Sequence, residues 1–483
     1  MPETLDETYE RVLRDIHKAN RDHARRLLHC LTVAIRPLRV EELAEVLAVD
    51  FDAALKGGIP QMNTNWRWAD QHQAVLSTCS SLIAIVKDGY SEVVQFSHFS
   101  VKEFLISDPL ARASGDVSRY HILLEPAHTI LAQACLGVLL RFDDDIDEYS
   151  AWDIPLAEYA AQHWVEHAQF ENVSSHMRQA MEYVFDAEKP HWAAWFRVHN
   201  IDVYWDWFSS DRSIYDGSPL YFTALCGFYD LAEHLVGMHP EDINTESGRL
   251  VTPLVAALHG KHFRIAELLH RHGASVNVRG DAEWTPLHVA CATGRMDIVQ
   301  WLINHGVDVN AQSSLCWTPL HEAAYYQQLE LIQMLLDHGA DINARTDLGC
   351  IPLHHAASPL NNRPQLDILQ ILLDYGSDPN IRDNAGLTAL HHSSYWETDG
   401  SIPLLGTVEA TRLLLEHGAN IDAEDNKGRT PLQLALVHGR EEMVRVLSEH
   451  GATQPSADFL AGVRSRQSDN RSISSSYTAQ STI

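Results

Sequence analysis

Two histidines and a glutamate stand at a spacing that zinc hydrolases use on a single helix. His163-Trp-Val-Glu166-His167 is an HxxEH string, and residues four apart lie on one face of an α-helix. Two imidazoles on one face can bind Zn²⁺ while the glutamate activates a water molecule, provided that a further ligand comes from elsewhere in the chain. This string is the strongest indication of an enzyme in the sequence, and the enzyme would be a zinc-dependent hydrolase.

The residues around this string favour a structural role instead. Leu156, Tyr159, Ala160, Trp164 and Ala168 give the same helix an apolar, partly aromatic face for packing. The chain also contains 29 histidines, so a short match arises easily by chance. The sequence contains neither a GxSxG nucleophile elbow nor a GxxxxGKS/T phosphate loop. We therefore predict that the chain is not an enzyme and uses no metal or cofactor, and we keep the zinc hydrolase as the alternative.

The most regular elements lie in the C-terminal half, where the sequence repeats itself. Thr285-Pro-Leu-His288 and Thr318-Pro-Leu-His321 stand 33 residues apart, which is the ankyrin period. A second motif recurs near the end of each unit, as in Leu335-Leu-Asp-His-Gly339. The repeat starts are Thr252, Thr285, Thr318, Ile351, Thr388 and Thr430, after a degenerate first unit at Ser218. Seven ankyrin repeats over residues 217–454 are predicted.

The residue types at these positions suit pairs of helices. A threonine oxygen can cap the free amides of a helix start, and proline is tolerated at the first helical position. The histidine that follows can hydrogen-bond the backbone there, and the glycine after each second helix suits a left-handed C-terminus. One unit cannot bury its apolar face alone, so the units stack into an α-solenoid with a long exposed surface. Such a surface predicts a protein that binds other proteins.

Candidate binding residues lie at the fingertip loops between repeats and at the end of each first helix, where side chains point outward. Exposed aromatic side chains there would be hot spots, because they bury a large area with little loss of freedom. The alternative is that these aromatic side chains pack under the inserted loops. The predicted protein-binding residues are Thr293, Tyr325, Tyr326, Tyr395, Trp396 and His438.

Two repeats are longer than the period, by four residues between Ile351 and Thr388 and by nine between Thr388 and Thr430. Both insertions are rich in turn-forming residues and fall between the paired helices. Loop closure costs rise slowly with length, so such insertions are tolerated without a function. A role in the choice of partner is the other interpretation.

Residues 1–110 predict a winged-helix domain. Thr4 with Glu7 and Ser100 with Glu103 form capping boxes that mark two helix starts. Two further helices flank a turn at Arg36-Pro-Leu-Arg39, and strands on either side of Gly89 supply a wing. The helix after the turn carries Glu41, Glu42 and Glu45 and no lysine or arginine from residue 40 to 51. Phosphate groups would repel this helix, so we expect no nucleic-acid partner.

A helical connector and cap over residues 111–216 and a disordered, serine-rich tail over 455–483 complete the mainly α architecture. Trp192 and Trp195, with the aromatic residues 204–208, are expected to pack in the core and cap the first repeat; an exposed partner site is the alternative. Asp143-Asp-Asp-Ile-Asp-Glu148 is expected to be a solvated turn, since it lacks the EF-hand spacing for calcium.

Segments of the N-terminal part resemble a known family. Pro2 to Leu13, Arg36 to Glu45 and Phe96 to Leu105 are similar to the winged helix of fungal NACHT-type STAND proteins, also labelled the winged helix of GPI inositol-deacylase-like proteins. The resemblance implies a signal-transducing hinge that follows an NTPase module and precedes helices and ankyrin repeats. Without the phosphate loop, the chain resembles the C-terminal half of such a protein or a shortened relative.

Composition bounds the partners and the location. The net charge of −29 would repel nucleic acid and anionic lipid, and the longest apolar run is too short to span a membrane. The seven cysteines lack a CxxC pair, which fits reduced thiols and predicts neither disulfides nor a zinc knuckle. The N-terminus does not resemble a signal peptide, so we expect a cytoplasmic or nuclear protein whose oligomeric state the sequence leaves open.

Overall fold

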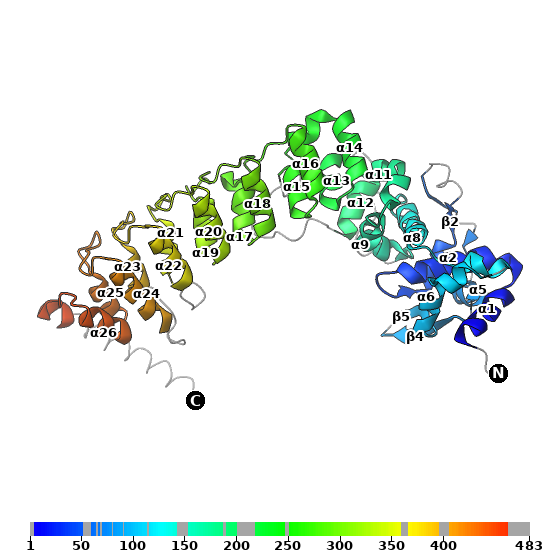
Figure 1. Cartoon of the computed structure of the whole chain (residues 1–483), viewed down its shortest axis with the longest axis horizontal. Helices are drawn as coiled ribbons and strands as arrows, with labels where there is room; N and C mark the ends of the chain where they lie inside the picture. Colours follow the sequence, from blue (N-terminus) through cyan, green and yellow to red (C-terminus); the bar gives the residue numbers. More distant parts are fainter. Residues whose placement is uncertain are drawn as a thin grey trace. The chain divides into compact units, whose positions relative to one another are not determined.

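The computed structural model of the chain is mainly helical (Figure 1). It comprises two compact units, Met1–Ser275 and Val276–Ile483. The structure describes residues 4–51, 59–63, 66–67, 70–79, 81–89, 91–113, 115–142, 153–186, 190–199, 218–246, 251–358, 366–395 and 405–461.

The first unit begins with the predicted winged helix. Strands β4 and β5 pair antiparallel around a turn at Gly89, with Ile83 opposite Phe96, and β1 pairs with the other side of β5. The wing and the two helices around the turn are therefore confirmed. Its elements are α1 (Leu5–Asp15), η1 (Lys18–Asn20), α2 (Arg21–Val33), β1 (Leu38–Arg39), α3 (Val40–Val46), β2 (Val49–Asp50), β3 (Gln61–Met62), α5 (Gln71–Cys79), β4 (Ile83–Asp88), β5 (Ser91–Phe96) and α6 (Phe99–Leu105).

Two details of this domain differ from the prediction. The capping box of Thr4 and Glu7 is present, but α6 begins two residues earlier than its predicted box, because its N-cap is His98, whose side chain accepts from the amide of Ser100. Helix α5 is not predicted from the sequence, because its apolar and polar residues are only weakly separated onto opposite faces of the helix.

Two of the three glutamates on α3 are buried and form ion pairs. The carboxylate of Glu42 is paired with both Arg36 and Arg39, while the carboxylate of Glu45 is paired with Arg67. These ion pairs hold the pKa of Glu42 below its usual range even though burial acts to raise it. Since two of its three carboxylates are turned inward, α3 does not present the acidic surface that the sequence suggests.

The connector docks against the winged helix within the first unit. The Arg39 guanidinium lies 3.2 Å from the Glu158 carboxylate on α9, and the amide of Ile35 donates to the hydroxyl of Tyr159 over 3.1 Å. Its elements are α7 (Asp108–Ala111), η3 (Gly115–Tyr120), α8 (Leu124–Leu139), α9 (Ala157–Ala168), α10 (Val173–His176), α11 (Arg178–Val184) and α12 (Pro190–Val198).

An aromatic core forms where the connector meets the first repeat. The indoles of Trp164, Trp192 and Trp195 are buried, and Trp164 packs against Phe185 and Phe228 at ring-centroid distances of 5.9 and 5.5 Å. The predicted core role of Trp192 and Trp195 is confirmed. Residues 143–148 and 204–208 lie outside the described residues.

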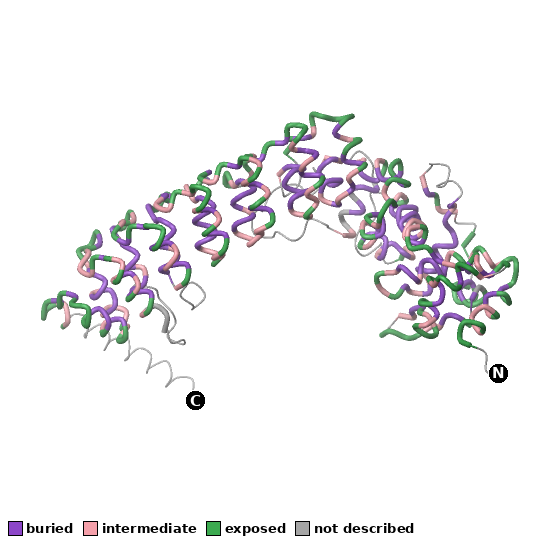
Figure 2. Tube along the Cα trace, viewed as in Figure 1, coloured by how far each residue is buried: buried purple, intermediate pink, exposed green. Residues whose placement is uncertain are grey.

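The ankyrin repeats appear as successive helix pairs, two in the first unit and five in the second. Figure 2 shows the buried stretches along the helices and many exposed ones in the loops. The pairs are α13 (Pro219–Cys226) with α14 (Tyr229–Met238), α15 (Pro253–His259) with α16 (Phe263–Arg271), α17 (Pro286–Ala292) with α18 (Met296–Asn304), α19 (Pro319–Tyr325) with α20 (Leu329–Asp337), α21 (Pro352–Ala357) with α22 (Leu366–Asp374), α23 (Ala389–Tyr395) with α24 (Leu405–Glu416), and α25 (Pro431–Val437) with α26 (Glu441–Glu449); the 3₁₀ turns η5 (Pro240–Asn244) and η6 (Asp281–Glu283) precede α15 and α17.

At two repeat starts a histidine completes the cap that begins with the predicted threonine. The Nδ1 of His288 accepts from the amide of Thr285 over 3.2 Å, and the Nδ1 of His321 accepts from the amide of Thr318 over 3.1 Å. Thr285 and Thr318 are the N-cap residues of α17 and α19, as predicted, and at each start the imidazole of the third helical residue reaches back to complete a capping box. Thr430 is likewise the N-cap of α25, and its hydroxyl accepts from the amide of Gln433. The predicted contact of the histidines with the backbone is confirmed.

The ends of the second helices and the insertions also follow the sequence. Gly306 after α18 has φ of 76°, a left-handed conformation that a side chain would strain. Both insertions separate the two helices of a pair, and most of their residues lie outside the described part. The sequence predicts no ordered structure after residue 454, whereas residues 457–461 are helical.

Candidate functional site

The HxxEH string lies on α9, but its second histidine is already fully engaged. The Nδ1 of His167 lies 2.9 Å from the Nδ1 of His128, and its Nε2 lies 2.8 Å from the hydroxyl of Tyr159. Burial, with the neighbouring His128, lowers the pKa of His167 to about 3. His163 is bonded to Glu166 over 3.2 Å. Since both nitrogens of His167 make hydrogen bonds inside the core, the structure does not support a zinc hydrolase.

The second unit offers a different kind of site, which is built from its fingertip loops. Each loop closes on itself, as where the amide of Ser313 donates to the carbonyl of Trp317 over 2.9 Å. Each loop is also hydrogen-bonded to the next one. The amide of Asp347 donates to the carbonyl of Leu315 over 3.0 Å, and the amide of Asn384 donates to the carbonyl of Leu348 over 2.9 Å. This backbone ladder fixes the spacing of the fingertips.

A second ladder joins the repeats at the loops that follow the second helices. The side-chain oxygen of Asn310 accepts from the amide of Asp341 over 2.7 Å, while its nitrogen donates to the carbonyl of Gly339 over 3.0 Å. Asn380 makes the same pair of bonds to Asn420 and Gly418. Because both sets of loops are tied from repeat to repeat, side chains on the first helices are held at fixed intervals.

Three aromatic side chains gather on the fourth repeat, and we call them the aromatic cluster: Trp317, Tyr325 and Tyr326. All three are half-buried. Tyr325 packs edge-on against Trp317 and Tyr326 at 5.5 and 5.0 Å between ring centroids. The half-buried imidazole of His355 lies against Trp317 at 4.6 Å between ring centroids, and desolvation lowers its pKa to about 3. The cluster therefore combines a rigid base with aromatic surface that solvent can reach.

The structure places the other predicted binding residues separately. Thr293 is half-buried, and its hydroxyl donates to the carbonyl of Val289 over 2.8 Å. His438 is half-buried at the end of α25. Tyr395 is the last residue of α23, and Trp396 lies outside the described residues. Of the six predicted residues, Tyr325 and Tyr326 are the two that the structure brings together with a further aromatic side chain.

Exposed leucines at two neighbouring fingertips were missed. Leu315 and Leu348 are 55% and 66% exposed, and they sit on adjacent rungs of the backbone ladder. Trp284 and Trp317, at equivalent positions 33 residues apart, were also missed and are half-buried. Their sequence signal is a large apolar residue inside a fingertip loop.

A buried carboxyl group lies in the same repeat. Glu322 is 3% exposed, and burial raises the pKa of its carboxyl group to about 8. Burial raises the pKa values of Cys291 in the preceding repeat and of Tyr326 at the end of α19, and the neighbouring Glu322 adds to both shifts. The fourth repeat therefore holds an acid that is largely protonated at neutral pH.

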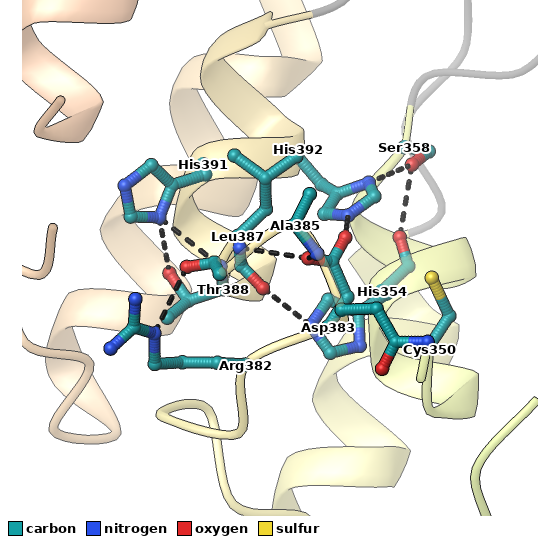
Figure 3. A network of polar contacts seen from close by, with 12 residues as sticks. Cys350, His354, Ser358, Arg382, Asp383, Ala385, Leu387, Thr388, His391 and His392 are labelled. Carbon is teal, nitrogen blue, oxygen red and sulfur yellow. Dashed lines mark hydrogen bonds and ion pairs between the residues drawn. The ribbon is translucent and has the colours of Figure 1, made fainter. Parts of the chain in front are cut away.

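A polar network joins the fifth and sixth repeats (Figure 3). Potential metal-ligand atoms of Cys350, Asp383 and His392 all lie within 4.8 Å of one another. The Nε2 of His392 is 3.1 Å from the Asp383 carboxylate, and its Nδ1 is 3.2 Å from the hydroxyl of Ser358. Sequence reasoning found no such group, because these residues are 33 and 9 positions apart and match no metal motif.

Among the described residues, no helix is both long and apolar enough to cross a lipid bilayer.

Two family models match the chain in the order that the structure shows. Residues 10–116 match the winged helix domain of GPI inositol-deacylase. Four overlapping segments, 220–313, 254–346, 309–383 and 353–458, match ankyrin repeats. The chain is therefore a winged-helix domain followed by ankyrin repeats, which are non-catalytic elements for protein interaction.

Two curated proteins are similar to parts of the chain. The azaphilone pigments biosynthesis cluster protein L of Monascus ruber is 29% identical over 287 residues, which cover 56% of this chain and 59% of that protein. The ankyrin repeat and LEM domain-containing protein 1 homolog of Caenorhabditis elegans is 46% identical over 54 residues, 11% of this chain and 8% of that protein. The chain thus spans less than two thirds of the length of either relative.

Proposed function

We propose that this chain is a non-enzymatic scaffold or sensor arm that binds another protein through its fourth and fifth ankyrin repeats. The observation that carries the proposal is the aromatic cluster of the fourth repeat, together with the exposed leucines Leu315 and Leu348 at adjacent fingertips. Aromatic and aliphatic anchors at fixed positions are typical of interface hot spots, because they bury apolar area with little loss of side-chain freedom.

The same surface suggests the chemistry of the partner. Its exposed apolar side chains would pack against an apolar patch or an amphipathic helix of the partner. The chain's net charge of −29 favours a partner with basic residues around that patch. Charge complementarity would act mainly on the association rate, whereas the anchors would govern dissociation. The predicted residues Thr293, Tyr395, Trp396 and His438 would extend this surface to the neighbouring repeats.

The first unit supports a role in signal transmission. Its winged helix matches a domain associated with NACHT-type proteins, and Arg39 and Tyr159 tie it to the connector. We infer that it acts as a STAND-like hinge that couples the repeats to an NTPase module located outside this sequence. On this proposal the protein works in the cytoplasm or nucleus of a fungus.

The test is a comparison of affinities with the full chain. Pull-down with the wild-type chain and mass spectrometry identify the partner, which is then purified and titrated. Leu315→Ser combined with Leu348→Ser should weaken the complex on the order of tenfold or more, as expected for two anchors. Leu123→Ser, an exposed leucine of the first unit, is the matched control and should leave the affinity unchanged. Equal affinities of all three proteins would refute the proposed surface.

A further inference from the structure

The side chains of Cys350, Asp383 and His392 come from two adjacent repeats. Cys350 precedes α21 of the fifth repeat, whereas Asp383 lies in the following fingertip loop and His392 on α23 of the sixth. Their sulfur, oxygen and nitrogen atoms fall within 4.8 Å of one another. Zn²⁺ binds sulfur at about 2.3 Å and nitrogen at about 2.0 Å, so the ligand atoms of a tetrahedral site lie roughly 3.5 Å apart. Small side-chain rotations close that difference.

The hydrogen bonds around His392 fix which of its nitrogens faces the cluster. The single hydroxyl proton of Ser358 is donated to the carbonyl of His354 over 3.0 Å, so the oxygen of Ser358 can only accept from the Nδ1–H of His392 (Figure 3). In the neutral ring the Nε2 then carries a lone pair, which points at the Asp383 carboxylate 3.1 Å away. Two electron pairs at this distance require a cation between them, either a proton or a metal ion.

The equivalent aspartate of the next repeat, Asp425, has an arginine partner that Asp383 does not have. One oxygen of Asp425 accepts the amides of Lys427 and Arg429, and its other oxygen is paired with the Arg429 guanidinium. Asp383 makes the same two amide bonds, to Ala385 and Leu387.

At the position of that arginine the sixth repeat has Leu387, which carries no charge. The second oxygen of Asp383 is therefore directed to the histidine and the cysteine rather than to a guanidinium group.

Cys350 also differs from the residues at the equivalent position of neighbouring repeats. Its position holds tryptophan in the two preceding repeats, at Trp284 and Trp317, and the thiol of Cys350 is buried. Burial, aided by the Asp383 carboxylate, raises the pKa of this thiol to about 11. A divalent cation reverses both effects, since it supplies positive charge beside the sulfur and the carboxylate.

We propose that Cys350, Asp383 and His392 form a zinc-binding site that links the fifth and sixth ankyrin repeats. Sulfur, imidazole and carboxylate ligands are the donor set that Zn²⁺ prefers, and coordination releases the thiol proton of Cys350 to solvent. Ser358 acts as a positioning residue, because its bond to Nδ1 orients the ring. The fourth coordination position is left to a water molecule or to an external ligand atom. By binding only the folded junction, the ion stabilises these repeats.

The test uses Co²⁺ as a spectroscopic probe on the full chain after treatment with a chelator. A thiolate bound to Co²⁺ gives a sulfur-to-cobalt charge-transfer band, which surface histidines do not produce. The band should saturate at one equivalent per chain and disappear when Zn²⁺ is added. Cys350→Ser should abolish it, and His392→Asn and Asp383→Asn should weaken Co²⁺ binding on the order of tenfold or more, with a similar loss in Ser358→Ala.

Two control variants separate the site from general effects on the fold. Cys316→Ser removes a half-exposed cysteine of the neighbouring repeat, and Asp425→Asn alters the equivalent turn of the next one. Both should retain the band at wild-type affinity, and circular dichroism should show that every variant is folded. Absence of the band in the wild type, its persistence in Cys350→Ser, or equal losses in the controls would overturn the proposal.

Discussion

The Nε2–H of His321 donates a hydrogen bond to the carbonyl oxygen of Cys350 in the next repeat, over 3.2 Å. The Nδ1 of the same ring accepts from the amide of Thr318 over 3.1 Å, so one neutral imidazole caps its own helix and joins two repeats. Three further histidines repeat this bridge: His288 to Trp317, His354 to Leu387 and His391 to Arg429.

Replacement of a bridging histidine should destabilise the second unit. In His321→Leu the buried amide of Thr318 and the carbonyl of Cys350 lose their partner, which should lower the free energy of unfolding by roughly 2–4 kcal/mol. Urea unfolding followed by circular dichroism measures the change. His338→Leu, at an exposed helix end, should change it by less than about 0.5 kcal/mol. Similar losses in both variants would contradict a special role for the bridge.

The bridges should also make the second unit sensitive to acid. Burial lowers the pKa of His321 to about 4, whereas the unfolded ring titrates near 6.5. Between these values the unfolded chain binds the proton and the folded chain does not, so stability is complete above pH 6.5 and falls toward pH 4. Each such ring should contribute about 1.4 kcal/mol per pH unit. Unfolding of the wild type and of His321→Gln from pH 7.5 to 4.5 should show a shallower slope for the variant.

Glu322 should have the opposite pH dependence. Its folded pKa of about 8 lies above the usual value of 4.5, so the folded chain holds the proton more tightly and stability falls as the pH rises from 4.5 to 8. Glu322→Gln removes this loss and should raise the free energy of unfolding on the order of 2 kcal/mol or more at pH 8, with little gain at pH 5. Glu330→Gln, on the exposed face of α20, should have no such effect. A gain in Glu322→Gln that does not depend on pH would argue against a buried, protonated acid.

The aromatic residues that the sequence selects can be tested with the partner in hand. Tyr326→Ala combined with Trp396→Ala should weaken the complex by about 2 kcal/mol or more if both side chains are hot spots. The melting temperature should remain nearly unchanged, because Tyr326 is only half-buried. Calorimetric titration and thermal unfolding measure the two quantities on the same samples. Parallel loss of folding and binding would assign these side chains to packing.

Much of the fold could be predicted, because its signals are local. The 33-residue period, the glycine after each second helix and the capping box at Thr4 each act within a turn or two of chain. The wing was predictable for the same reason, since Gly89 stands between two apolar strands. Helix α5 could not be predicted, because its apolar and polar residues are not clearly separated onto opposite faces. The start of α6 could not be predicted either, because histidine is not a usual N-cap residue.

The candidate site was predicted only in part. The sequence selected Tyr325 and Tyr326 from their place at the end of a first helix, but it did not select Trp317, which packs against Tyr325 from a loop eight residues earlier. Nor could it show that His167 of the HxxEH string is already bonded to His128 and Tyr159. The contact with His128 depends on how α9 packs against α8.

The sequence by itself therefore determined the order of the domains, the register of the repeats and the absence of the usual catalytic motifs. The tertiary structure decided which charged and polar side chains meet. His128 on α8 meets His167 on α9, and Cys350, Asp383 and His392 converge from two repeats. The reason is physical: capping and turn formation act between near neighbours in the chain, whereas contacts between distant residues and metal coordination depend on distances that arise only when one helix or repeat packs on the next.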